Sequence, residues 1–135
     1  MSLVVGIDTG VNTGFAVWDR ERKVLTELTT LKIHQAMERV RELSYQDDIV
    51  VYFEDARQRK WFGSAGREQL QGAGSVKRDC GIWEDFLKDL NVEYHAIPPK
   101  NNLTKMNADL FAKVTGWKGR TSEHARDAAF LVINR

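Results

Sequence analysis

The chain has 135 residues, a net charge of +1, 42% hydrophobic residues and 29% charged residues. This length and balance suit a single globular domain over residues 1–135 and exclude a disordered chain. No apolar run reaches the roughly 20 residues of a membrane helix, and Asp8 interrupts the first run, which argues against a signal peptide. We therefore expect a cytoplasmic protein with no membrane partner, whose one cysteine, Cys80, packs in the core.

Short apolar runs predict strands, and runs with apolar residues three or four apart predict helices. The expected strands are residues 3–8, 13–18, 23–29, 48–53 and 92–97. The expected helices are residues 33–45, 68–90 and 107–114, and a last one that Thr121 or Ser122 caps and that runs to the C-terminus. Residues 56–66 are expected to form a loop. An antiparallel meander followed by alternating helices and strands predicts an α/β domain: one mixed five-stranded sheet with helices on both faces.

Basic residues gather in two blocks of the chain. The first block comprises Arg57, Arg59, Lys60, Arg67, Lys77 and Arg78, and the second comprises Lys100, Lys105, Lys113, Lys118 and Arg120. Such asymmetry is typical of a phosphate-binding face and equally of a solvated surface, so charge alone leaves both open. Two aromatic residues, Trp61 and Phe62, lie inside the first block. They suit stacking on nucleic-acid bases, with burial in the core as the alternative.

Four polar residues occupy positions that suit metal binding or catalysis. Asp8 and Glu54 each end an apolar strand, and His124 and Asp127 lie at positions i and i+3 of the last helix. A carboxylate at the end of a buried strand is costly unless it is paired or bound to a metal. Converging oxygen ligands suit Mg²⁺ or Mn²⁺, and two such ions can promote phosphodiester hydrolysis. Taken singly, each residue also fits an ordinary role in a turn or on a solvated surface.

Four motifs resemble those of the RuvC-type Holliday-junction resolvases, which belong to the RNase H-like superfamily. Residues 6–17, GIDTGVNTGFAV, resemble the first motif: an acid-bearing strand, a glycine turn and a second strand. Residues 51–54, VYFE, are similar to the second acidic motif, and residues 124–129, HARDAA, to the third. Residues 97–100, IPPK, are similar to the family's strand-end proline and lysine. The resemblance spans nearly the whole chain, in the compact form of phage relatives.

The resemblance implies an RNase H-like sheet and a metal-dependent endodeoxyribonuclease that resolves four-way junctions or other branched DNA. It implies two Mg²⁺ ions per site, which Mn²⁺ can replace, and no small-molecule cofactor. The implied catalytic and metal-binding residues are Asp8, Glu54, His124 and Asp127. His124 is then a metal ligand or a proton acceptor; Glu123 is an alternative ligand, which the helical wheel places farther from the buried arc. Lys100 and Lys105 would neutralise phosphates near the metals.

Paired nicks in a four-way junction require two active sites related by a two-fold axis, which predicts a homodimer. Helix 68–90 is the expected interface, because its glycines and its apolar stripe permit close packing, although the stripe also packs in part on the chain's own sheet. The expected DNA-binding residues are Arg57, Arg59, Lys60, Trp61, Phe62, Arg67, Lys77 and Arg78. Recombination, repair and trimming of phage DNA, in a bacterial or phage-infected cell, all remain open as the process served.

Three other functions fit part of the pattern. A nuclease of the same fold could act on flaps, forks or RNA, and the sequence does not separate these substrates. An actin-like nucleotide-binding module also opens with an acid-bearing strand and a glycine turn, but it needs a duplicated domain for which 135 residues leave no room. A DNA-binding scaffold that has lost its chemistry is disfavoured, because all four candidate positions keep suitable side chains.

Overall fold

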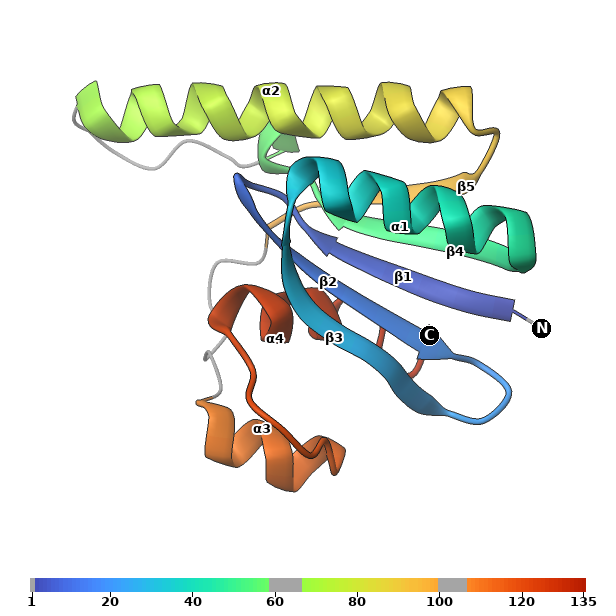
Figure 1. The fold of residues 1–135 in the computed structure, drawn as a ribbon. Coiled ribbons are helices and arrows are strands. Elements are labelled where there is room, and N and C mark those ends of the chain that lie inside the picture. Colours follow the sequence, from blue (N-terminus) through green and yellow to red (C-terminus); the bar gives the residue numbers. More distant parts are fainter. Residues whose placement is uncertain (1, 59–66, 100–106) are drawn as a thin grey trace.

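The computed structural model describes residues 2–58, 67–99 and 107–135, and for residues 67–73 it describes the backbone alone. The elements follow the expected order (Figure 1). The strands are β1 (Ser2–Asp8), β2 (Asn12–Asp19), β3 (Val24–Lys32), β4 (Asp48–Glu54) and β5 (Glu93–Ile97). The helices are α1 (Ile33–Gln46), the short 3₁₀ turn η1 (Ala56–Gln58), α2 (Arg67–Asp89), α3 (Ala108–Thr115) and α4 (Glu123–Phe130).

Two expectations about local structure are wrong. Residues 56–58 form a 3₁₀ turn where a loop was expected, while the rest of that loop lies outside the described residues. The last helix ends at Phe130 instead of reaching the C-terminus. Beyond it the N–H groups of Leu131 and Val132 bond to carbonyls three residues back, which tightens the chain into turns and buries Val132.

The sheet has the strand order β3-β2-β1-β4-β5. Strands β1, β2 and β3 pair antiparallel, whereas β1 pairs parallel with β4, and β4 with β5. The predicted mixed sheet, with a meander followed by parallel strands, is confirmed. Because β1 and β4 run parallel, their last residues, Asp8 and Glu54, lie at the same end of the sheet.

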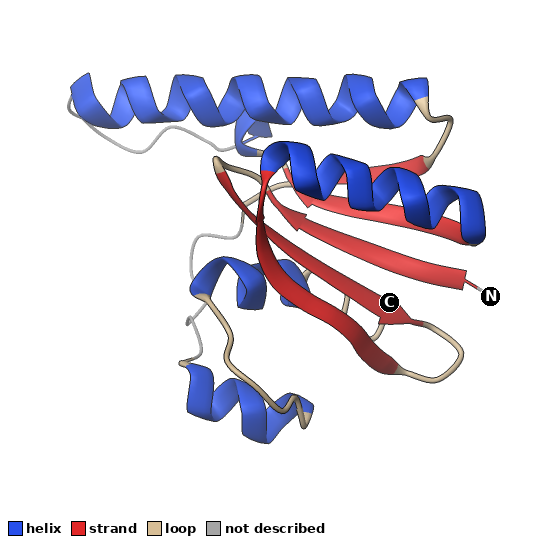
Figure 2. Cartoon of the chain, in the orientation of Figure 1, coloured by secondary structure: helices blue, strands red, loops and turns tan. Residues whose placement is uncertain are grey.

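Helices cover both faces of the sheet, as predicted (Figure 2). On one face α1 and α2 pack against the alternate residues Leu3, Val5 and Ile7 of β1 and their neighbours. On the other face α3 and α4 pack against a second core that contains Val4. The thiol of Cys80 is fully buried in the first core, so the expectation of core packing is confirmed. No helix in the described ranges is long and apolar enough to cross a membrane.

Two glycines let α4 lie directly on the sheet. A Cβ atom added to Gly14 would overlap the carbonyl oxygen of His124, and one added to Gly6 would overlap that of Ala128. Gly6 and Gly14 lie on the same face of the sheet, on the neighbouring strands β1 and β2. The missing side chains therefore determine how closely the backbone of α4 approaches the end of β1.

Candidate functional site

Asp8 and Glu54 lie side by side at one end of the sheet. Ile7 pairs with Phe53 in the parallel register of β1 and β4, so the next residue on each strand is a candidate acid. Side chains alternate between the faces of a strand, and Ile7 and Phe53 both point into the core under α1 and α2. Asp8 and Glu54 therefore lie on the opposite face, which α4 covers, and both are partly buried.

His124 reaches this end of the sheet from the first turn of α4. Ser122 caps the helix by accepting a hydrogen bond from the backbone N–H of Ala125, and its hydroxyl also contacts that of Thr30 on β3. Nδ1 of His124 lies 3.0 Å from Oδ2 of Asp8. The imidazole is about half exposed, whereas the Asp8 side chain is only 15% exposed. Packing thus joins two candidates that are 116 residues apart in the sequence.

The remaining α4 candidates differ in burial. Asp127 lies one helical turn after His124 and is partly buried, whereas Glu123 is exposed at the start of the helix. Carboxylate oxygens and an imidazole nitrogen are donors that suit a hard divalent ion. Within residues 2–58, 67–99 and 107–135, no three His, Cys, Asp or Glu side chains lie close enough together to hold a metal ion. The donor chemistry therefore fits a metal, but a closed set of three ligands is not formed in this conformation.

The backbone beside the two strand-end acids is in contact with the side chains of Thr9 and Cys80. The hydroxyl of Thr9 donates to the carbonyl oxygen of Glu54 at 3.4 Å, and the Cys80 thiol lies 3.6 Å from the same oxygen. Burial raises the pKa of this thiol, which stays neutral. The turn between β1 and β2 is closed by a 2.8 Å hydrogen bond from the Thr13 hydroxyl to the carbonyl of Gly10. Gly10 has φ of 152°, a conformation that favours glycine.

Arg57 has a different environment from the one the sequence suggested. Its guanidinium donates to both carboxylate oxygens of Asp55 and to Glu84 on α2. Sequence reasoning missed Asp55 and Glu84. The acid-x-Arg pattern directly after β4 was the available signal for Asp55, whereas Glu84 carries no local signal, because it lies 27 residues from Arg57.

The other expected DNA-binding residues are only partly described. Lys77 and Arg78 are exposed on α2. Four expected residues lie outside the described ranges, namely Arg59, Lys60, Trp61 and Phe62, as do Lys100 and Lys105. Arg67 begins α2, but its side chain is not described. In the second basic block, Lys113, Lys118 and Arg120 are exposed.

Two α2 glycines in the expected dimer interface face open space. A Cβ added to Gly74 or Gly81 would meet no atom within 4 Å. Ile82, beside Gly81, is 47% exposed. These glycines are therefore not needed for packing against the part of this chain that the structure describes.

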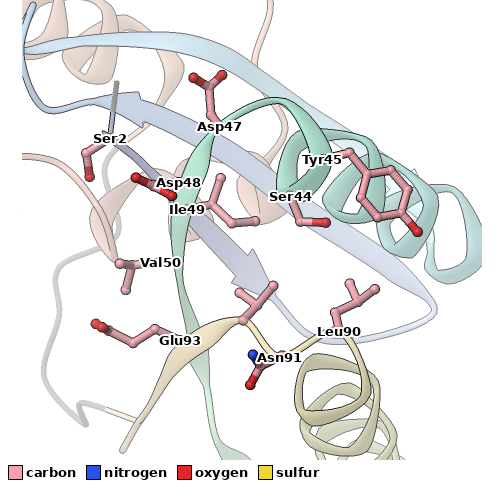
Figure 3. A pocket seen from close by; sticks show the side chains of 11 residues that line it. Ser2, Ser44, Tyr45, Asp47, Asp48, Ile49, Val50, Leu90, Asn91 and Glu93 are labelled. Carbon is pink, nitrogen blue, oxygen red and sulfur yellow. The ribbon is translucent and has the colours of Figure 1, made fainter.

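A hollow of about 390 Å³ lies at the opposite end of the sheet (Figure 3). It is lined by the starts of β4 and β5 and by the end of α1. Three acids contribute to it, Asp47, Asp48 and Glu93. Since β1 and β4 run away from this end, the hollow is separate from the end that carries Asp8 and Glu54.

No protein-family model matches the chain, and no curated protein is significantly similar to it.

Proposed function

We propose that this protein is a metal-dependent endonuclease of RNase H-like fold that cuts four-way junctions or other branched DNA. The 3.0 Å contact between His124 and Asp8, next to Glu54 on the adjacent strand, is the observation that carries the proposal. The sheet also has the topology that the motif resemblance implies, a meander followed by parallel strands.

Asp8, Glu54 and Asp127 would hold Mg²⁺ or Mn²⁺ through carboxylate oxygens, two ions to a site, in a conformation that brings the ligands together. Bound divalent ions supply positive charge that lowers the pKa of water and offsets the charge of the reacting phosphate. His124 either adds a nitrogen ligand or acts as the base. As a base, it donates through Nδ1–H to Asp8 and accepts the proton of water at Nε2.

Exposed cations on two sides of the sheet would bind the phosphates of the DNA arms. They are Lys77 and Arg78 on α2, and Lys113, Lys118 and Arg120 on α3 and the segment after it. Such contacts make binding weaken as salt concentration rises. Paired cutting of a junction needs two copies of the chain, and the open faces of Gly74 and Gly81 support an interface along α2. The proposed setting is the cytoplasm of a bacterial or phage-infected cell.

A substrate panel tests the proposal. A synthetic four-way junction, a fork, a flap, a linear duplex and an RNA duplex are each incubated with Mg²⁺, with Mn²⁺ and with chelator. We expect metal-dependent nicking of branched DNA in preference to the linear duplex. If RNA were cut in preference to DNA, the proposed substrate would be wrong but the proposed nuclease activity would stand. An absence of cutting on every substrate with either metal would overturn the proposal.

Asp8→Asn supplies the matched test of the site, with Asp48→Asn as its control. Both substitutions remove one carboxylate charge from a β-strand, but Asp48 is exposed at the other end of the sheet. We expect Asp8→Asn to keep junction binding and lose cutting, whereas Asp48→Asn keeps both. Normal cutting by Asp8→Asn would remove Asp8 from the site.

A further inference from the structure

The residue after Glu54 is anchored on the opposite face of the sheet. The backbone N–H of Asp55 donates to the carbonyl of Ile97 at 2.8 Å, which extends the pairing of β4 with β5 by one residue. The Asp55 side chain is almost fully buried and lies on the α2 side, as Phe53 does two residues earlier. Because neighbouring residues of an extended chain point to opposite faces, an anchored Asp55 directs Glu54 toward α4.

Four hydrogen bonds hold the carboxylate of Asp55. The Arg57 guanidinium donates to its two oxygens at 2.8 and 3.0 Å, in the fork geometry that arginine offers a carboxylate. The backbone N–H of Arg57 adds a bond of 3.0 Å to the first oxygen. The side-chain amide of Gln58 donates at 3.1 Å to the second oxygen and also to the carbonyl of Ala96 on β5.

Arg57 extends the network to α2 and to a further residue of β5. Its remaining terminal nitrogen donates to Glu84 of α2 at 3.2 Å. The other carboxylate oxygen of Glu84 accepts a 3.2 Å hydrogen bond from the hydroxyl of Tyr94 on β5. The turn after β4 is thus tied to α2 and to β5 through one guanidinium.

The charges in this network are mutually stabilised. Burial by itself would raise the pKa of Asp55, but hydrogen bonds from Arg57 and Gln58 outweigh it and lower that pKa. The hydrogen bond from Arg57 also lowers the pKa of Glu84, and both acids raise the pKa of Arg57. All three groups are therefore ionised at neutral pH, and the positive charge of Arg57 is already compensated by two carboxylates.

We propose that Asp55, Arg57 and Glu84 form a positioning network that fixes the direction of Glu54. This inference rests on the proposed function, in which Glu54 is a metal ligand. It assigns Arg57 a role different from phosphate binding, since each nitrogen of its guanidinium donates to Asp55 or Glu84 and these two carboxylates compensate its charge.

The test compares Arg57→Gln, Arg57→Lys and Glu84→Gln with a matched control, Arg39→Gln. Arg39 also bridges two carboxylates, Glu27 on β3 at 2.9 Å and Glu42 on α1 at 3.0 Å, but it lies away from β4. For each protein we would measure thermal stability, cutting of the preferred branched DNA, the affinity for Mn²⁺ without DNA, and the salt dependence of DNA binding in chelator.

The three network variants should lower kcat by about 10- to 100-fold with little change in KM, since a misplacement near 1 Å has effects of that size. They should also weaken Mn²⁺ binding by about tenfold or more, as loss of groups that orient a metal ligand does. Arg57→Lys should fail to restore either property, because lysine keeps the charge but not the fork. Arg39→Gln should lose stability without these changes.

Three results separate the possible failures. If the wild type cuts and Glu54→Gln does not, but Arg57→Gln cuts and binds Mn²⁺ as the control does, the positioning role is overturned while the nuclease stands. In the second result, Arg57→Lys cuts and binds Mn²⁺ as the wild type does, while in Arg57→Gln the salt dependence of DNA binding falls by about one phosphate contact. That pair of observations would assign Arg57 to DNA binding. A wild type that neither cuts nor binds Mn²⁺ overturns the proposed function, and the positioning role with it.

Discussion

The two ends of the sheet both carry acids, yet they differ in how those acids are held. At one end Asp8 and Glu54 are partly buried on adjacent parallel strands, and His124 contacts Asp8 from a separate helix. At the other end Asp48 and Glu93 are exposed around an open hollow. An exposed carboxylate is solvated by water, whereas a partly buried one needs a partner. On this physical ground we expect chemistry at the end where packing brings acids together, and none at the hollow.

The largest expected difference between the two ends of the sheet is in the rate of DNA cutting. We expect Asp8→Asn to lower kcat by about 10³-fold or more, because losing several kcal/mol of charge stabilisation in the transition state corresponds to that factor. Asp48→Asn should change kcat by less than about twofold, as surface changes usually do. Single-turnover cleavage of a labelled junction measures both. Equal losses in the two variants would mean that the ends of the sheet are not functionally different.

A change at Gly14 tests whether close packing creates the site. Gly14→Ala should destabilise the fold by about 3 kcal/mol and separate His124 from Asp8, because the new methyl group overlaps the α4 backbone. In the monomer, Gly74→Ala, in open space on α2, should instead stabilise by about 0.5–1 kcal/mol through helix propensity. Urea denaturation gives both free energies of unfolding. A Gly14→Ala protein as stable as the wild type would contradict the close approach of α4.

Acid titration tests how the buried carboxylate of Asp55 contributes to stability. The folded-state pKa of Asp55 lies below its ordinary value of 3.8, so Asp55 contributes stability above about pH 4. That contribution is lost as pH falls through the folded-state pKa. Asp55→Asn should therefore have a free energy of unfolding about 3 kcal/mol below that of the wild type at pH 7. As the pH falls, this free energy should decline less in the variant than in the wild type. Free energies of unfolding of both proteins, measured between pH 7 and pH 2.5, test this prediction. If the two proteins lost stability equally as the pH falls, the prediction would be contradicted.

The smallest expected effect is at the hollow. Asp48→Asn combined with Glu93→Gln should change the free energy of unfolding by no more than about 0.5 kcal/mol, because both side chains are exposed. Thermal melting and the junction-cutting assay would each show a near-normal protein. A large loss of either property would mean that the acids of the hollow have a role beyond the exposed 3.1 Å contact between Glu93 and His95.

Most of the fold could be predicted from the sequence, because local patterns report local structure. The strand and helix order, the mixed sheet and the burial of Cys80 all follow from apolar periodicity and are confirmed. Ser122 was one of two predicted caps, and the structure selects it. The end of α4 could not be predicted, since the chain turns at Leu131 to bury Val132 in a core that distant residues supply.

The sequence by itself determined which residues are candidates for the site: acids at the ends of apolar strands, and a histidine and an acid on one helical face. Only the tertiary structure decided that His124 contacts Asp8 and that Arg57 bonds to Glu84. The physical reason is that these partners are far apart in the chain and meet through packing. For His124 that packing depends on two glycines, Gly6 and Gly14, which let a helix backbone approach the sheet.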